Sequence, residues 1–340
     1  MKKNLYVISG VTGMTGSELA RQAVARGETV LGFDNFFASS IDAVCDILDN
    51  ANFVFCEYDI ANAEDMRRIA GHIRRHKKLY QRIIYINCAA VVHTEYFYRI
   101  HDTFETNVTA MNLFLEQAIE CGAEQFINCS TSEIYSMHSF NGDDGVAETD
   151  YALLATAEHS QRTSYAAGKL ITEFFTKDAV MNGRIRGCSI RFANVYSKNE
   201  RFSKHIIPHI IKSLYSTGEV ELLENSRINR RTFLHNYDSC AAVLALSDTE
   251  SALDGGIYNV ATDEEVSIID LVYIIAEKLN IKNPRITFNG FRSADPQRRL
   301  LNTEKIRRTT NWSPAVSLSD GLDMCIAHIQ QSAASSKERR

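Results

Sequence analysis

The sequence lacks several features that would assign it to particular classes of protein. It has no apolar run of the ~18 residues that a membrane-spanning helix needs, and we expect neither a membrane segment nor a signal peptide. Lys and Arg number 37 against 42 Asp and Glu, so the net charge of -5 gives no reason to expect binding to nucleic acid or to a membrane surface. No group of His, Cys and Asp has the spacing of metal ligands, and we predict no metal site.

The eight cysteines contain no C-x-x-C pair. Cys88, Cys129 and Cys188 lie in or beside apolar runs that are typical of buried strands. Scattered thiols of this kind are typical of proteins in a reducing compartment. We therefore expect buried free thiols and a cytoplasmic protein.

The 340 residues are enough for two domains, or for one large domain with an added lobe. Apolar runs predict strands at 5–8, 29–33, 53–55, 83–87, 126–129 and 188–192, and helical patterns predict helices at 17–26, 63–76, 103–121 and 164–181. Such alternation predicts an α/β fold with a doubly wound parallel sheet of the Rossmann type. The segments shorten after Asn194, so we place the Rossmann domain at 1–193, a smaller C-terminal lobe mostly at 194–330, and a flexible tail at 331–340.

The first strand leads directly into a glycine-rich turn. Gly10, Gly13 and Gly16 follow it with the spacing G-x-x-G-x-x-G, and Asp34 ends the next strand. Glycines here let the backbone approach a pyrophosphate, whose charge is stabilised by the helix N-terminus. The carboxylate of Asp34 can bond the ribose hydroxyls of an adenosine and would repel a 2'-phosphate. The unit therefore predicts a site for NAD rather than NADP.

A second group of polar residues follows later strands. Ser130 to Glu133 come directly after the strand at 126–129, and Tyr165 precedes Lys169 by four residues in a predicted helix. Residues four apart lie on one face of a helix. A nearby ammonium favours the phenolate, so we expect Lys169 to lower the pKa of Tyr165 and make it a base near neutral pH.

With these motifs, the sequence resembles the extended short-chain dehydrogenase/reductase family over nearly its whole length. The matching residues are Gly10, Gly13, Gly16, Asp34, Asp59, Ile60, Cys88, Ala89, Ala90, Asn107, Ser130, Thr131, Ser132, Glu133, Tyr165, Lys169 and the stretches 191–196 and 231–233. The resemblance implies a tightly held NAD, a nucleotide-diphosphate sugar as substrate, and a homodimer. The expected cofactor-binding residues are Gly10, Gly13, Met14, Thr15, Gly16, Asp34, Asn35, Asp59, Ile60, Ala89, Ala90, Asn107, Tyr165 and Lys169.

The resemblance also implies roles for the catalytic and substrate-binding residues. Tyr165 would be the base and Lys169 its ribose-bound partner, Thr131 would orient the sugar, and Ser132 and Glu133 would complete the catalytic group. The candidates for substrate binding are Asn194 and Arg231, on the diphosphate, with His93, Lys204 and Arg298. The charged run 295–299 is either a clamp on the nucleotide or a solvated surface.

The type of reaction depends mainly on Glu133. A carboxylate at this position offers a second base for the acidic C5 hydrogen of a 4-keto intermediate. The Thr-Ser-Glu triad at 131–133 resembles that of GDP-mannose 4,6-dehydratases and of UDP-glucuronate decarboxylases, and the stretches 104–107 and 202–208 resemble dTDP-glucose 4,6-dehydratases. We predict a 4,6-dehydratase that makes a 4-keto-6-deoxy sugar nucleotide.

A UDP-glucuronate-type decarboxylase and a 4-epimerase remain alternatives. The decarboxylase also needs a cationic contact for the sugar carboxylate, for which Arg231 is a candidate. A non-catalytic NAD-binding sensor is disfavoured because Tyr165, Lys169 and Glu133 are all present.

Two further stretches bear on assembly and substrate. The predicted helices 103–121 and 164–181 carry Met111, Leu113, Phe114, Phe174 and Phe175, which we expect in a dimer seam. The segment 137–162 is long, acidic and free of proline, where relatives tend to carry a short loop with proline. Because that loop helps to shape the sugar pocket, the segment leaves the identity of the sugar open.

Overall fold

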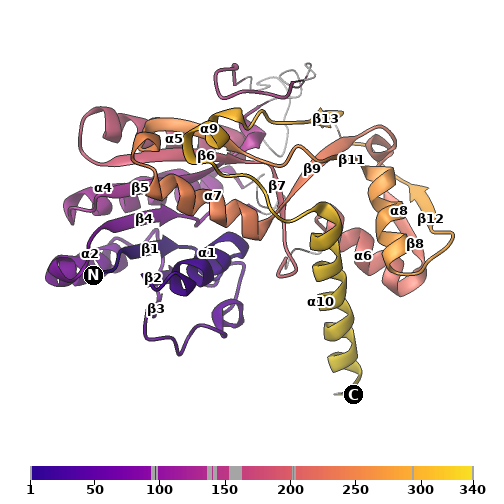
Figure 1. The fold of residues 1–340 in the computed structure, drawn as a ribbon, viewed down its shortest axis with the longest axis horizontal. Helices are drawn as coiled ribbons and strands as arrows, with labels where there is room; N and C mark the ends of the chain where they lie inside the picture. Colours follow the sequence, from indigo (N-terminus) through magenta and orange to yellow (C-terminus); the bar gives the residue numbers. More distant parts are fainter. Residues whose placement is uncertain are drawn as a thin grey trace.

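The computed structural model describes residues 2–92, 96, 99–135, 140, 144–152, 163–200, 202, 204–292 and 295–338. A parallel seven-stranded sheet in the order β10-β6-β5-β4-β1-β2-β3 forms the larger part of the molecule (Figure 1). Its strands are β1 (Leu5–Ser9), β2 (Thr29–Asp34), β3 (Phe53–Glu57), β4 (Ile83–Asn87), β5 (Gln125–Thr131), β6 (Arg186–Phe192) and β10 (Asp254–Val260). The strand order reverses direction at β1 and β4, which is where ligands bind in sheets of this kind.

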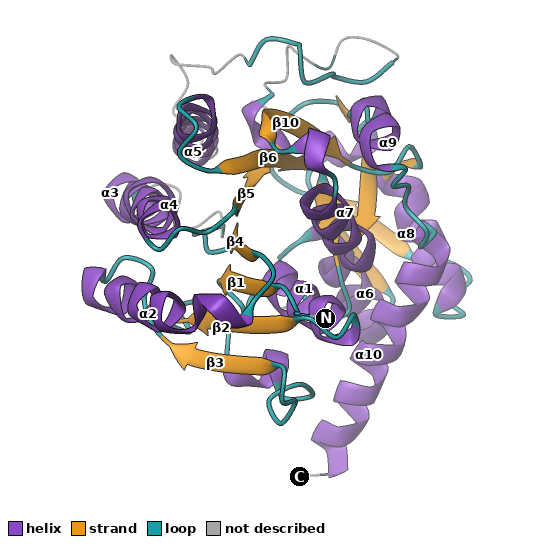
Figure 2. Ribbon diagram, turned by 60° about the vertical axis from the view of Figure 1, so that its left-hand side comes forward, coloured by secondary structure: helices purple, strands orange, loops and turns teal. Residues whose placement is uncertain are grey.

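Helices cover both faces of this sheet (Figure 2). One face carries α1 (Met14–Ala25) and α7 (Asn236–Asp248), and the other carries α2 (Ala63–His76), α4 (Met111–Glu120) and α5 (Thr163–Met181). The short α3 (Ile100–Phe104) leads into α4 through a π-helical stretch, Glu105–Ala110. Two separate hydrophobic cores fill the two sides. The predicted Rossmann-type α/β fold is confirmed.

The remaining strands form a smaller lobe beside the sheet (Figure 1). In it, β9 (Arg230–His235) pairs with β7 (Asn194–Tyr196), β11 (Glu265–Ser267) and β13 (Arg298–Arg299), while β8 (Glu219–Leu222) pairs with β12 (Arg285–Phe288). Its helices are α6 (Ile206–Thr217), α8 (Ile268–Lys278) and α10 (Leu318–Glu338), with α9 (Glu304–Thr310) next to β10. A third hydrophobic core holds the lobe together.

Two expectations about the chain's organisation differ from the structure. The predicted division at residues 193 and 194 is not clean, because β10 and α7 return to the large sheet after the chain has entered the lobe. The apolar residues of β10, Ile257, Tyr258 and Val260, pair with β6 and bury its edge. The predicted flexible tail at 331–340 is helical through Glu338, as the last turns of α10.

None of the helices in the described ranges is long and apolar enough to cross a bilayer.

Candidate active site

A cavity of about 740 Å³ lies at the carboxyl ends of the central strands. It brings together most of the residues predicted to bind the cofactor or to act in catalysis: Gly10, Gly13, Met14, Thr15, Gly16, Asp34, Asn35, Asp59, Ile60, Ala89, Ala90, Thr131, Tyr165 and Lys169. Asn107 lies behind the cavity wall. Its side chain accepts from the backbone N–H of Val91 (2.7 Å) and donates to the Val91 carbonyl (3.1 Å), so it fixes the loop after β4.

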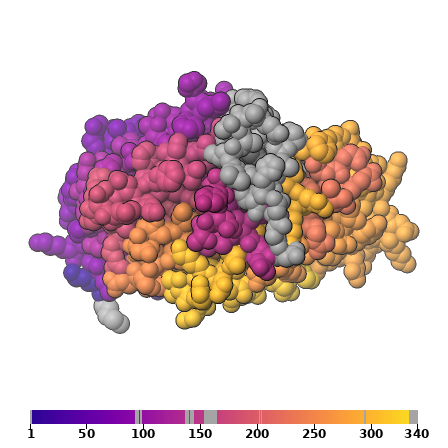
Figure 3. Space-filling view, turned by 90° about the horizontal axis from the view of Figure 1, so that it is seen from above, coloured from indigo at the N-terminus to yellow at the C-terminus, as the bar shows by residue number. Residues whose placement is uncertain are grey.

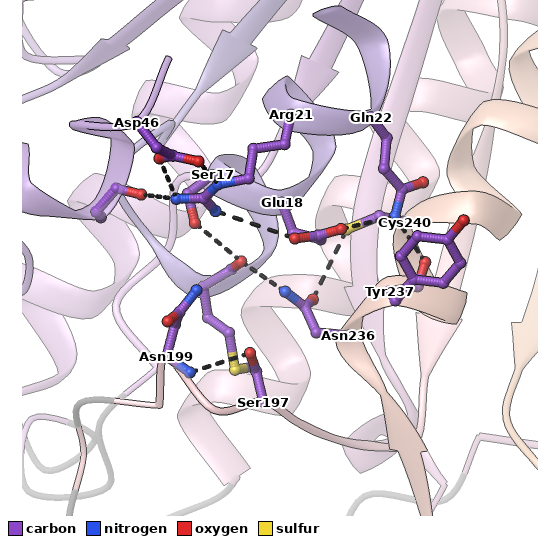
Figure 4. Close-up of polar contacts among 12 residues, drawn as sticks. Ser17, Glu18, Arg21, Gln22, Asp46, Ser197, Asn199, Asn236, Tyr237 and Cys240 are labelled. Carbon is purple, nitrogen blue, oxygen red and sulfur yellow. Dashed lines mark hydrogen bonds and ion pairs between the residues drawn. The ribbon is translucent and has the colours of Figure 1, made fainter. Parts of the chain in front are cut away.

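At two glycine positions, Gly10 and Gly16, the turn has no room for a side chain. Gly10 has φ +67°, and a Cβ there would lie 2.8 Å from the Cα of Ala89. A Cβ on Gly16 would lie 2.2 Å from the carbonyl oxygen of Gly10, so the turn and the first turn of α1 could not approach each other. From the other side, Asn236 of α7 donates to the carbonyl of Met14 at 2.8 Å (Figure 4). The turn is therefore held in a fixed shape at the N-terminus of α1, where backbone N–H groups favour an anion.

The end of β2 presents a fixed carboxylate to the cavity. Asp34 accepts hydrogen bonds from the backbone N–H groups of Thr12 (3.1 Å) and Phe36 (2.9 Å). The loop that follows β2 is anchored by Arg21 of α1, whose guanidinium pairs with Asp46 at 2.7 Å (Figure 4). The turn, the helix N-terminus and the carboxylate together fit the pyrophosphate and the adenosine ribose of NAD.

Tyr165 and Lys169 both lie on α5 and are buried at the inner end of the cavity. The ammonium of Lys169 donates to the backbone carbonyl of Cys129 at 2.8 Å, and burial lowers the pKa of Lys169. Burial also raises the pKa of Tyr165, and the negative charge of Glu133 adds to this, while a hydrogen bond with Thr131 opposes it. The expected lowering of the Tyr165 pKa is thus wrong for the protein alone, because desolvation of the phenolate is the largest effect and raises the pKa.

Glu133 forms an ion pair with Arg299, the last residue of the charged run 295–299, and this pairing was not predicted. Arg299 lies on β13, its side chain is only 3% exposed, and Phe140 lies with its ring centre 6.0 Å from the guanidinium carbon. The Nε of Arg299 is buried and has no hydrogen-bond partner within the part of the chain that the structure describes. A buried donor without a partner is costly, so this atom is an unsatisfied group, although neither Arg299 nor Glu133 lines the cavity described above.

Part of the acidic segment 137–162 fixes the position of β13. Val146 forms a bridge with Leu301, and the N–H of Val146 donates to the carbonyl of Leu300 at 3.0 Å. Glu148 accepts from the backbone N–H of Asn259 at 2.7 Å. Figure 3 shows the magenta atoms of this stretch at the surface, beside the yellow atoms of the C-terminal part. We call residues 144–152 the clasp, since they fasten the segment after β13 to the edge of the large sheet.

Four of the five predicted substrate-binding residues, Asn194, Lys204, Arg231 and Arg298, do not line the described cavity. Arg231 pairs with Asp295 at 3.0 Å and donates to two backbone carbonyls. Arg298 pairs with Glu265 at 2.7 Å, and Asn194 donates to the carbonyl of Thr232 at 3.1 Å. The other two are Lys204, which is exposed, and His93, which lies outside the described residues. The roles of all five remain predictions, as does that of Ser132, which is buried in the turn after β5.

Comparison with known proteins decides the family. The model of the NAD dependent epimerase/dehydratase family matches residues 6–261. The chain belongs to this family. The cofactor of the family is NAD, in agreement with the cavity described above and with the prediction from the sequence.

Individual relatives in the family carry out different reactions. The chain is 24% identical to UDP-glucuronic acid decarboxylase 2 of Arabidopsis thaliana, over 96% of this chain and 68% of that protein. It is also 24% identical to dTDP-glucose 4,6-dehydratase of Streptomyces griseus, over 94% of this chain and 92% of that protein. The two relatives catalyse different reactions and are equally similar to this chain, so the similarity identifies the family and not the reaction.

Solved structures with the same fold include two enzymes with bound NAD. The dTDP-glucose 4,6-dehydratase of Streptomyces venezuelae aligns with a TM-score of 0.83 at 20% identity, over 97% of this chain and 98% of that one. The UDP-glucuronic acid 4-epimerase of Bacillus cereus, in complex with UDP-glucuronic acid and NAD, aligns with a TM-score of 0.83 at 21% identity, over 96% of this chain and 99% of that one.

Proposed function

We propose that the enzyme is an NAD-dependent decarboxylase of a nucleotide-linked uronic acid. In this reaction the C4 hydroxyl is oxidised, the C6 carboxylate leaves as carbon dioxide, and the hydride returns to C4. The products are a nucleotide-linked pentose and carbon dioxide, with no net consumption of cofactor. The observation that supports this choice is the buried Arg299 beside Glu133, with a donor atom that has no partner in the described chain.

A buried guanidinium distinguishes between the candidate reactions. A dehydratase needs Glu133 to accept the C5 proton, yet an adjacent cation stabilises a carboxylate and so makes it a weaker base. A decarboxylase needs no base at C5, because the bond between C5 and C6 breaks toward the 4-keto group. It does need a cation to hold the C6 carboxylate, and a planar guanidinium suits a carboxylate well.

Each residue of the candidate active site has a separate role in the proposed reaction. Bound NAD supplies the hydride acceptor and, in its oxidised form, a positive charge. The Oη of Tyr165 would take the proton from the C4 hydroxyl, and Lys169 would hold the ribose next to it. Arg299 would bind the C6 carboxylate until that group leaves, and C5 would then take up a proton from water. Asn194 and Arg231 remain our candidates for contacts to the diphosphate.

The 4,6-dehydratase remains the second candidate because of one feature of the site. The charge of Glu133 raises the pKa of Tyr165, which requires the two groups to lie close together. A carboxylate so near the catalytic phenol is well placed for proton transfer at C5 if it can leave Arg299.

Mass spectrometry of the products separates the candidates. The purified enzyme is incubated with UDP-glucuronate, UDP-glucose and dTDP-glucose in separate reactions. Decarboxylation removes 44 mass units from the uronate, dehydration removes 18 from a hexose, and epimerisation changes no mass. Loss of 18 units from a hexose, with the uronate untouched, would overturn the proposal in favour of the dehydratase.

The variant Arg299→Lys tests the residue that carries the proposal. Lysine keeps the charge but cannot form the two parallel hydrogen bonds of a guanidinium. Loss of one charge-assisted hydrogen bond is worth about 1.5–3 kcal/mol, so we expect kcat/KM on the uronate to fall by about 10- to 100-fold. Arg285→Lys is the control, since Arg285 lies on β12 with 68% of its side chain exposed. Equal kcat/KM in the two variants would exclude Arg299 from the reaction.

We further propose that the enzyme is a homodimer and that it acts in the cytoplasm. Exposed apolar residues on α5, among them Phe174 and Met181, support the dimer. All eight cysteines are free thiols, which fits a reducing compartment.

A further inference from the structure

Two cysteines that the proposed reaction does not use lie side by side in the floor of the cofactor cavity. Cys88 follows β4 and Cys129 lies in β5, directly after the paired residues Asn87 and Asn128. Their Sγ atoms are 3.8 Å apart, and both residues line the cavity. Neighbouring positions on adjacent parallel strands have a Cα separation of about 5 Å, within the range that a disulfide allows.

The two thiols share one hydrogen bond and differ in acidity. The hydrogen bond with Cys88, together with the charge of Lys169, lowers the pKa of Cys129 against the effect of burial. The same hydrogen bond and burial raise the pKa of Cys88 well above its usual value. Cys129 is thus the nucleophile of the pair, and Cys88 holds the proton beside it.

We propose that Cys88 and Cys129 are an oxidisable dithiol, which hydrogen peroxide converts to a disulfide and which bound NAD protects. In the first step the thiolate of Cys129 attacks one oxygen of the peroxide. The O–O bond breaks, hydroxide leaves, and Cys129 becomes a sulfenic acid. In the second step the sulfur of Cys88 attacks the sulfur of Cys129, the S–O bond breaks, and water leaves with the proton of Cys88.

Closure of the disulfide must disturb the cofactor site. The sulfur atoms have to approach from 3.8 Å to a bond length of about 2.05 Å, so both side chains must leave their present positions and pull on the strand ends that carry them. Next to Cys88, the N–H of Ala89 donates to Ser9, and the Cα of Ala89 lies against the Gly10 turn. At the other strand, the carbonyl of Cys129 holds Lys169. Because oxidation displaces groups that NAD needs, bound NAD must in turn oppose oxidation by the same free energy.

The test uses the full-length protein, freed of NAD or saturated with it, and treated with hydrogen peroxide. Peptide mass mapping without reductant should find Cys88 linked to Cys129, with two mass units lost, in the NAD-free sample. Saturating NAD should slow this linkage by about 10-fold or more, because the bound cofactor fills the cavity that both thiols line. Calorimetry should show NAD affinity lowered by about 5- to 150-fold after oxidation, the range of a coupling of 1–3 kcal/mol, and dithiothreitol should restore it.

The outcomes that overturn the proposal are equally specific. The proposal is wrong if Cys88 and Cys129 stay reduced while other cysteines are oxidised. It is also wrong if the two cysteines become linked at the same rate with and without NAD, or if the linked protein binds NAD with unchanged affinity. These readouts are masses and cofactor affinities, so they do not depend on which sugar reaction the enzyme performs. Failure of the proposed decarboxylation would leave this test intact, and failure of this test would leave the decarboxylation intact.

Two variants identify the order of the steps. Cys88→Ser should leave Cys129 as a sulfenic acid, which dimedone traps, and no disulfide should form. Cys45→Ser is the control, because Cys45 is exposed and outside the cavity, and it should form the linkage at the wild-type rate. Dimedone found on Cys88 in the variant Cys129→Ser, rather than on Cys129 in Cys88→Ser, would overturn the assignment of the nucleophile. Peptide mass mapping of the wild-type protein tests the linkage even if a variant fails to fold.

Discussion

The protonation of a single phenol limits the chemistry of this site. Burial and the charge of Glu133 both raise the pKa of Tyr165, so the neutral phenol is favoured near pH 7. As the proposed base, Tyr165 would accept a proton from the sugar only in its phenolate form. The rate of C4 oxidation should therefore rise with pH through the neutral range, as more of the phenolate forms.

Two variants test this dependence. Tyr165→Phe should lower kcat/KM by about 100-fold or more and flatten its pH profile, since a general base contributes on that scale. Glu133→Gln removes a charge that raises the pKa of Tyr165, so the rising limb of the profile should move to lower pH. The pH profiles of kcat/KM for the three proteins measure both effects. A limb that stays in place in Glu133→Gln would show that the carboxylate does not act on the phenol.

Residues of this site differ in how far the sequence reveals them. The glycine turn and Asp34 could be predicted because they lie within about 30 residues of each other, at the spacing that a dinucleotide requires. The glycines allow close approach of the pyrophosphate, and the carboxylate bonds the ribose. Arg299 could not, since it lies 166 residues from Glu133 and reaches it only through the pairing of β13 with β9. The pKa of Tyr165 was predicted with the wrong sign because burial of the phenol cannot be read from a four-residue spacing.

Among the elements, the clasp has the clearest consequence for catalysis. It joins the segment after β13 to the sheet edge, so it fixes Arg299 in front of Glu133. Gly145 makes this contact possible, because a Cβ there would lie 2.9 Å from the backbone N of Asn302. The acidic segment that the sequence left unexplained thus has one structural role in its described part.

Gly145→Ala tests the clasp, and the chain offers a matched control. Gly145 and Gly183 have φ of +75° and +65°, so alanine costs about 1–2 kcal/mol of backbone strain at both. A Cβ on Gly183 would meet no described atom within 4 Å. Both variants should lower the melting temperature, but only Gly145→Ala should also lower kcat/KM on the uronate below that of the wild type. An equal loss of kcat/KM in both would mean that the clasp does not position Arg299.

The elements of the sheet were easier to predict than those of the lobe. Buried parallel strands such as β1 and β4 are continuous apolar runs, so their bounds can be estimated from the sequence alone. The lobe's strands are shorter, and three of them, β7, β11 and β13, have three residues or fewer. Such short strands are stabilised by pairing with strands that are distant in the sequence, and a local sequence pattern does not predict this pairing.

At the scale of the whole molecule, the surface of α5 carries apolar residues that support the proposed dimer. Phe174 is 60% exposed and Met181 is 73% exposed, and Phe175 lies beside them at 37%. Met111 and Phe114, which we also expected in the seam, are fully buried in the core between α4 and the sheet, so that part of the expectation is wrong. The proposed dimer seam therefore consists of residues of α5, the helix that also carries Tyr165 and Lys169, and of Leu113 on α4, which is half-buried.

The variant Phe174→Asp should separate the dimer. In a two-fold symmetric interface each copy contributes the same residue, so one substitution removes two buried rings. Loss of about 2 kcal/mol for each ring amounts to about 4 kcal/mol, which raises the dissociation constant by nearly 1000-fold. Analytical ultracentrifugation over a range of micromolar concentrations measures this, with Phe291→Asp as the control because Phe291 is 74% exposed on the lobe. A wild-type protein that sediments as a monomer, or a Phe174→Asp variant that sediments like wild type, would exclude this seam. Circular dichroism and NAD binding of the variant show whether the separated subunit keeps its fold and its cofactor site.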